Sequence, residues 1–139
     1  MPARVAGNRG ANGIDGQLST FLGWAHPHME NWCIVGDLTT MYDLSSLWVT
    51  NQLPSQKMRM VVINNGGGQI FSRMFKKEIF LNKHKICFES WAKMWNWSYT
   101  KWQNVPKQAE LADLQVIELV PDESQTHAFW KEIEEIWKS

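Results

Sequence analysis

Two segments of the sequence carry oxygen ligands directly after apolar, strand-like runs. Asp37 follows the run at 31–36, and Asn65 follows closely after the run at 58–63. A hard cation such as Mg²⁺ prefers oxygen ligands and is commonly shared with phosphate groups. The Asp37 carboxylate, the Asn65 amide oxygen and a backbone carbonyl from the following glycines would supply three such ligands. The spacing therefore indicates a joint site for a divalent cation and a phosphate.

The glycine run at 66–68 forms the second part of this prediction. Consecutive glycines let the backbone approach a ligand closely, so that the Gly67 carbonyl can reach a cation and amide hydrogens can face phosphate oxygens. A simpler interpretation also exists. Asp37 could serve only as a helix cap and the glycines only as a flexible connection, because both features are common after strands. Spacing alone leaves both interpretations open.

The elements that must position these residues alternate between strands and helices. Strands are predicted at 3–7, 31–36, 58–63 and 115–120, and helices at 15–25, from 37 to about 52, at 87–96, 106–113 and 124–138. Such alternation favours an α/β fold, a three-layer, mostly parallel sheet with helices on both faces. Ligands of these folds bind beyond the carboxyl ends of the strands. The loops at 7–16, 36–40 and 64–70 are therefore expected to meet at one edge.

Apolar residues at helical spacing predict which side chains fill the core. The helix from 37 to about 52 is expected to bury Met41, Leu44, Leu47 and Trp48. The final helix is expected to turn inward Phe129, Ile133, Ile136 and Trp137. Tryptophans 91, 95, 97 and 102 are interpreted as core or subunit contacts, because no basic groove accompanies them for base stacking.

Composition limits the classes of function. The 139 residues fit one domain, and 14 Lys and Arg balance 14 Asp and Glu. A neutral chain has no overall attraction to nucleic acid or to an acidic membrane, and weak repulsion between copies suits a homo-oligomer. Neither a membrane span of about 20 apolar residues nor a signal peptide is recognisable. Cys33 and Cys87 are predicted to be reduced core thiols of a cytoplasmic protein.

One pair of motifs resembles the signature of thiamine-diphosphate-dependent enzymes. Gly36-Asp37 is followed, one crossover helix later, by Asn64-Asn65. In that family the aspartate side chain, the second asparagine side chain and a backbone carbonyl two residues later hold Mg²⁺ on the diphosphate of the cofactor. The resemblance thus implies thiamine diphosphate as cofactor and Asp37, Asn65 and Gly67 as ligands of Mg²⁺, or of Mn²⁺ in its place.

Leu38 points to one branch of that family, since most members have glycine after the aspartate. The blocks NRGANGIDGQLST (8–20), GDLTTMYDLSSL (36–47) and INNGGGQIFS (63–72) resemble the 2-succinyl-5-enolpyruvyl-6-hydroxy-3-cyclohexene-1-carboxylate synthases of menaquinone biosynthesis. These transferases decarboxylate 2-oxoglutarate and add the resulting carbanion to isochorismate. Beyond residue 72 the resemblance thins to a pattern of strands and helices.

The resemblance also assigns residues around cofactor and substrate. Ile14 matches the bulky apolar residue that keeps the cofactor bent, and Arg9 matches an arginine that pairs with a substrate carboxylate, a role that suits its planar fork. Met74 is the second substrate-binding residue that the resemblance implies, while Asn12 has no assigned role. The implied cofactor-binding residues are Ile14, Gly36, Leu38, Asn64, Gly66, Gly68, Ile70 and Phe71.

The family's activating glutamate has no counterpart in this chain. It lies on a separate pyrimidine-binding domain, and the glutamates at 30, 78, 89 and 110 stand in the wrong context. The chain is therefore expected to be a single diphosphate-binding domain, inactive alone and partnered by a pyrimidine-binding domain. A truncated chain, a natural fragment and a split-enzyme subunit remain open. So do a domain of an acetohydroxyacid synthase or oxo-acid decarboxylase, and a non-catalytic cofactor-binding domain.

Overall fold

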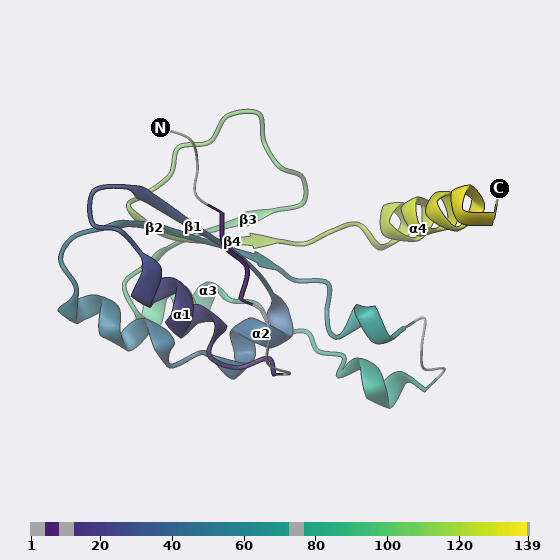
Figure 1. Ribbon diagram of the computed structural model, residues 1–139, viewed down its shortest axis with the longest axis horizontal. Coiled ribbons are helices and arrows are strands. Elements are labelled where there is room, and N and C mark those ends of the chain that lie inside the picture. The colour runs from purple at the N-terminus through teal and green to yellow at the C-terminus, as the bar shows by residue number, and fades with distance from the viewer. Residues whose placement is uncertain (1–4, 9–12, 73–76, 139) are drawn as a thin grey trace.

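The computed structural model describes residues 5–8, 13–72 and 77–138. Its centre is a sheet of four strands in the order β1-β2-β4-β3 (Figure 1). The strands are β1 (Glu30–Gly36), β2 (Lys57–Ile63), β3 (Ser98–Trp102) and β4 (Leu114–Leu119). All three neighbouring pairs are parallel. The predicted α/β class with a parallel sheet is confirmed.

Helices connect the strands and lie mainly on one side of the sheet. They are α1 (Gln17–Trp24), α2 (Asp37–Tyr42), α3 (Glu89–Met94) and α4 (Glu123–Lys138), with 3-10 helices η1 (Ser46–Gln52), η2 (Gln69–Phe71) and η3 (Glu78–Leu81). In Figure 1, α1, α2 and α3 lie below the sheet, and the loop 103–113 rises on the opposite side. The helices packed on the sheet thus cover one face, rather than both, in the described part of the chain.

One apolar cluster joins these helices to the sheet. Met58, Met60 and Val62 of β2 are at most 1% exposed, and they share a face because successive strand side chains alternate. Against them pack residues of α1, η1, β1, β4 and the region of α3, namely Leu18, Leu22, Val35, Leu47, Phe88, Trp91, Ala92, Trp97 and Val116. The core interpretation of the tryptophans is thereby confirmed for Trp91 and Trp97.

The helix predicted from 37 to about 52 ends at Tyr42. The next residue, Asp43, binds the start of α1 through its side chain. Its two carboxylate oxygens accept hydrogen bonds from Gly16 N at 2.7 Å and from Leu18 N at 2.8 Å. These amides belong to the start of α1 and have no helical acceptor of their own. Asp43 therefore caps α1 and fixes the loop before it against the end of α2.

This break changes which apolar residues are buried. Leu47 is fully buried, as predicted, and Met41 packs against the core at partial burial. Leu44 and Trp48 are 40% and 52% exposed, so their predicted burial is wrong. The reason is that the chain resumes as η1 after the turn, and the tighter helix does not continue the spacing of α2.

Three other elements differ from the sequence-based expectations. No helix forms at 106–113, and residues 5–7 of the strand predicted at 3–7 are not in a strand. β3 has no counterpart among the predicted strands, because it is only five residues long and mostly polar. α4 forms as predicted, but none of its residues is buried, and Trp137 is 76% exposed. The chain leaves the sheet at Pro121, and α4 extends beyond the strand ends (Figure 1).

The two cysteines are free thiols, as predicted. Cys33 is partly buried, and burial raises the pKa of its thiol to about 11. Cys87 is exposed, so the prediction of a core thiol is wrong for this residue. Separately, none of the helices in the described ranges has both the length and the apolar character needed to cross a membrane.

Candidate metal and diphosphate site

The loops that follow β1 and β2 meet at the carboxyl edge of the sheet. β1 and β2 pair in parallel up to Gly36 opposite Ile63, so the segments that follow these two strands leave the sheet at the same level. Directly beyond, Gly67 N donates a hydrogen bond of 2.9 Å to Asp37 Oδ2. The loops at 36–40 and 64–70, which were expected to meet, are therefore in direct contact.

Asp37 is buried, with 3% of its surface exposed, and both carboxylate oxygens have polar neighbours. Oδ1 accepts a hydrogen bond of 2.7 Å from Leu38 N. Oδ2 lies 3.2 Å from His84 Nε2, in addition to its bond from Gly67 N. The His84 Nε2 atom is itself buried and makes no hydrogen bond of good geometry within the described residues. A cation beside Asp37 Oδ2 would therefore have His84 Nε2 and Gly67 N as its neighbours.

His84 was missed by the sequence analysis, because the run Lys83-His84-Lys85 looks like a solvated basic loop. The structure instead places this segment against the glycine loop. Gly68 N donates to Leu81 O at 2.6 Å, and His84 N donates to Gly66 O at 3.2 Å. No local pattern indicates such a pairing.

Gly67 is required at its position for two reasons. Its φ of 138° lies in a region that favours glycine, and a Cβ built there would stand 2.4 Å from Leu81 O. The glycine loop therefore gives a close backbone approach, but in this structure segment 81–84 of the same chain makes it, and the predicted approach to a ligand stays a prediction. The Gly67 carbonyl accepts a hydrogen bond of 2.9 Å from Gln69 N, and its second lone pair can still serve a cation.

The amides of the glycine loop already have acceptors within the chain. Gly66 N donates to Asn64 Oδ1 at 3.2 Å, Gly67 N to Asp37, and Gly68 N to Leu81 O. In this conformation these three bonds fix the loop shape. A phosphate that took hydrogen bonds from the same amides would have to displace one of these acceptors.

Asn64 is held by a buried carboxylate that the sequence analysis also missed. Its Nδ2 donates to Glu118 Oε1 at 2.7 Å and to Ile86 O at 2.8 Å. Glu118 is 1% exposed, and its Oε2 accepts from Phe88 N at 2.9 Å and from Tyr99 Oη at 2.8 Å. A signal existed, because Glu118 interrupts the apolar run VIELV of a strand expected to be covered.

The ionisation of Glu118 follows from these contacts. Burial acts to raise its pKa, but the hydrogen bonds from Phe88 N, Tyr99 and Asn64 together hold the pKa below its ordinary value. The carboxylate therefore stays charged at neutral pH and acts only as an acceptor. Burial and the contacts with Cys87 and Glu118 raise the pKa of Tyr99, which remains a donor.

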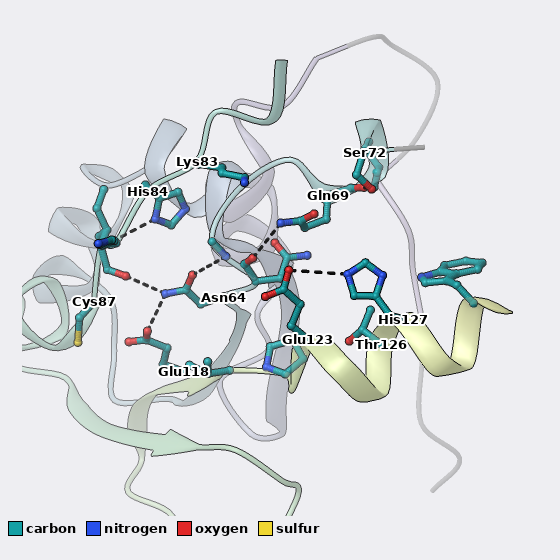
Figure 2. A pocket seen from close by; sticks show the side chains of 18 of the residues that line it. Asn64, Gln69, Ser72, Lys83, His84, Cys87, Glu118, Glu123, Thr126 and His127 are labelled. Atoms are coloured by element: carbon teal, nitrogen blue, oxygen red, sulfur yellow. Dashed lines mark hydrogen bonds and ion pairs between the residues drawn. The ribbon is translucent and has the colours of Figure 1, made fainter. Parts of the chain in front are cut away.

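A hollow of about 1440 Å³ opens beside this network, large enough for a cofactor-sized ligand (Figure 2). Four of the predicted site residues line it, namely Asn64, Asn65, Gly66 and Ile70. Figure 2 shows Glu123, Thr126 and His127 of α4 on the side opposite to His84 and Cys87. Asp37 and Gly67 are not among the lining residues. The hollow therefore borders the glycine loop and Glu118 without including the carboxylate of Asp37.

Two further predicted residues, Leu38 and Phe71, lie beside the glycine loop. Leu38 and Phe71 flank Gly68, since a Cβ at Gly68 would be 3.4 Å from Leu38 Cδ1 and 3.2 Å from Phe71 Cδ2. Ile70 is 77% exposed. Ile14 is partly buried and precedes Gly16, whose amide Asp43 holds. The predictions for Arg9, Asn12 and Met74 fall outside the described residues.

The donor set fits a magnesium ion only together with phosphate oxygens. No group of three or more His, Cys, Asp or Glu side chains in the described ranges is arranged to hold a metal. Asp37, Asn65 and the Gly67 carbonyl would instead offer one carboxylate, one amide and one backbone oxygen. Mg²⁺ prefers six oxygen ligands and often takes the remainder from phosphates and water. The position of Gly67 against Asp37 is compatible with such a shared site.

Comparison with curated proteins finds strong similarity to one group of synthases. It is 71% identical, over 99% of its own length, to a 2-succinyl-5-enolpyruvyl-6-hydroxy-3-cyclohexene-1-carboxylate synthase from Bdellovibrio bacteriovorus. A synthase of the same name from Akkermansia muciniphila is 36% identical over 88% of the chain. The matches cover 27% and 25% of those two proteins, so the chain spans about a quarter of their length. No family model matches the chain.

The fold has a counterpart among solved structures. The thiamine diphosphate-dependent 4-hydroxybenzoylformate decarboxylase of Rhodococcus jostii RHA1 aligns with a TM-score of 0.55. The alignment covers 76% of this chain and 22% of that protein, at 19% sequence identity. At this identity the likeness concerns the fold alone, which is the α/β arrangement described above.

Proposed function

We propose that this chain, which is homologous over nearly its whole length to part of the 2-succinyl-5-enolpyruvyl-6-hydroxy-3-cyclohexene-1-carboxylate synthases, is the thiamine-diphosphate- and Mg²⁺-binding domain of such an enzyme. The observation that carries the proposal is the hydrogen bond between Gly67 N and Asp37 Oδ2. It joins the two halves of the motif pair, which are distant in sequence, at the edge where parallel sheets bind ligands.

In this proposal the chain positions the cofactor and does not activate it. Asp37, Asn65 and the Gly67 carbonyl would hold the Mg²⁺ that accompanies the diphosphate. Ile14 lies in the loop that Asp43 anchors to α2, and its apolar side chain supports the bent form of the cofactor. Thiamine diphosphate, when bound, supplies the carbon that takes up the electrons released by decarboxylation. Arg9 and Met74 contact the substrate.

The complete enzyme that contains this domain has further parts. A pyrimidine-binding domain provides the activating glutamate, and copies of the enzyme associate as a homo-oligomer in the cytoplasm. The substrates are 2-oxoglutarate and isochorismate, and the enzyme is a transferase of menaquinone biosynthesis. The names of the relatives and the 71% identity of one of them support the assignment to a synthase of this kind, and the other properties are part of the proposal.

A chimera tests the proposal directly. The matching segment of the Bdellovibrio synthase would be replaced by this chain, and product formation from 2-oxoglutarate and isochorismate would be measured together with CO₂ release. The chimera is expected to be active, and the 139-residue chain alone is expected to release CO₂ at least about 100-fold more slowly, because a positioned acid-base group contributes about 10²- to 10⁴-fold.

Two outcomes would contradict the proposal. A chimera that folds and binds thiamine diphosphate but accepts only pyruvate or an aromatic 2-oxo acid would indicate an acetohydroxyacid synthase or oxo-acid decarboxylase instead. A chimera that folds but binds no cofactor would show that this segment is not its diphosphate-binding domain. The unmodified Bdellovibrio synthase, assayed in parallel, provides the reference rate for both substrates.

A further inference from the structure

Glu118 is a buried charge that the predicted set of metal ligands does not use. It is 1% exposed and surrounded by three hydrogen-bond donors, Asn64 Nδ2, Phe88 N and Tyr99 Oη. Removing a carboxylate from water costs several kcal/mol, and an apolar side chain of similar size usually fills such a place at lower cost. The presence of a carboxylate at this buried position is therefore better explained by the polar groups that it orients than by packing.

The side chain that Glu118 orients most strictly is Asn64. The two ends of this amide have different partners, because Nδ2 donates to Glu118 and to Ile86 O while Oδ1 accepts from Gly66 N. A flipped amide would turn its oxygen toward two acceptors and its nitrogen toward a donor. An ionised carboxylate can only accept hydrogen bonds, so Glu118 permits one orientation.

That orientation is transmitted to the glycine loop. Asn64 Oδ1 holds the amide of Gly66, where φ is 76° and the chain turns. The next amide, Gly67 N, then points to Asp37 Oδ2. Since Asn65 lies between Asn64 and Gly66, its position is fixed at both neighbours.

We propose that Glu118 is a positioning residue of the metal and diphosphate site, which acts by orienting Asn64 and thereby keeping the glycine loop against Asp37. Its effect on ligand binding rests on the proposed function, whereas its effect on the glycine loop does not. Partners that orient the ligands of a metal typically change metal affinity by about 10- to 100-fold when they are removed.

Glu118→Gln isolates the contact with Asn64. The introduced amide oxygen can still accept from Phe88 N and Tyr99 Oη, but the introduced NH₂ group then faces the NH₂ group of Asn64. If Asn64 flips to relieve that clash, it withdraws the acceptor from Gly66 N, and if the introduced amide turns instead, its NH₂ group meets Phe88 N. Tyr99→Phe is the matched control, because it removes one hydrogen bond to the other carboxylate oxygen of Glu118 and leaves the Asn64 contact in place.

Two measurements on the 139-residue chain decide the matter. In ¹⁵N NMR spectra without ligand, Glu118→Gln is expected to shift the Gly66 amide and the Asn64 side-chain amide, and Tyr99→Phe is expected to shift neither strongly. In calorimetric titrations with thiamine diphosphate at saturating Mg²⁺, Glu118→Gln is expected to weaken binding about 10- to 100-fold, and Tyr99→Phe is expected to leave the Kd unchanged.

The outcomes separate this inference from the proposed function. If the Gly66 and Asn64 signals move no further in Glu118→Gln than in Tyr99→Phe, the positioning role is overturned, whatever the binding data. If those signals move as expected but the wild-type chain binds no cofactor with Mg²⁺, the proposed function fails while the orientation of the loop by Glu118 stands. Equal Kd values for wild type and Glu118→Gln would overturn the role in binding.

A second variant covers the case in which Glu118→Gln does not fold. The double variant Asn64→Asp, Glu118→Gln reverses the direction of the hydrogen bond, so that the introduced amide donates and the introduced carboxylate accepts. That carboxylate keeps an acceptor for Gly66 N, while its other oxygen faces Ile86 O in place of the former donor. The Gly66 amide signal is expected close to its wild-type position. A Gly66 signal far from that position in the folded double variant would overturn the inference.

Discussion

Replacing Asp37 with alanine is expected to abolish the stabilisation of the chain by thiamine diphosphate and Mg²⁺. The wild-type chain, at a ligand concentration about 100 times the Kd, should gain about 2.7 kcal/mol. For a chain of this size, that corresponds to a rise of roughly 10 °C in Tm. Among the three proposed protein ligands Asp37 is the carboxylate, and without it the metal would meet only the neutral oxygens of Asn65 and Gly67. Thermal unfolding with and without cofactor and Mg²⁺ measures the effect.

Asp122→Ala provides a matched control for that experiment. Asp122 Oδ1 accepts from Gln125 N at 2.8 Å at the start of α4, so its loss should lower the Tm without ligand. The shift caused by the cofactor should remain as in the wild type. An equal ligand-dependent shift in Asp37→Ala and in the wild type would contradict the assignment of Asp37 as a metal ligand.

Replacing Gly67 with alanine is expected to produce the second large effect. The added Cβ would stand 2.4 Å from Leu81 O, and its other near neighbours at 3.1 Å and 3.2 Å are also backbone atoms. Backbone cannot move aside as a flexible side chain can, and the φ of 138° adds strain. Overpacking and strain together should cost about 2–5 kcal/mol of unfolding free energy. Urea unfolding measures this loss, and cofactor binding should weaken as segment 81–84 is displaced.

The same substitution at Gly23 serves as the control. Gly23 lies within α1, and a Cβ there has no neighbour within 4 Å. Because alanine favours a helix over glycine by about 0.5–1 kcal/mol, Gly23→Ala should raise stability slightly. Equal unfolding free energies for Gly67→Ala and the wild type would show that segment 81–84 does not pack on the glycine loop in solution.

The parts of the site that follow from a general rule could be predicted from sequence. The rule that parallel sheets bind ligands beyond their carboxyl ends was enough to bring Asp37 and Gly67 together. The runs at 31–36 and 58–63 are strongly strand-like, and the strands β1 and β2 end at Gly36 and Ile63, as those runs indicate. The parallel register brings the two loops to the same edge, where Gly67 N donates to Asp37 Oδ2.

The parts that depend on distant side-chain partners could not be predicted. Asp43 ends α2 by capping α1, His84 comes to lie beside Asp37, and Glu118 binds Asn64, each across a long stretch of chain. No local periodicity encodes these pairings. In α4 the local pattern was recognised, but it predicts only that one helix face favours burial. It does not identify a surface that covers this face, and no residue of α4 is buried.

The most direct test of the metal and diphosphate site is a crystal structure of the chain with thiamine diphosphate and Mn²⁺, whose anomalous scattering locates the metal without ambiguity. The proposal predicts one strong anomalous peak with oxygen ligands from Asp37, Asn65 and the Gly67 carbonyl, completed by diphosphate oxygens. In that structure Asp37 Oδ2 should have exchanged its contact with His84 for the metal. A diphosphate bound elsewhere, or a metal peak without Asp37 among its ligands, would contradict the proposed site.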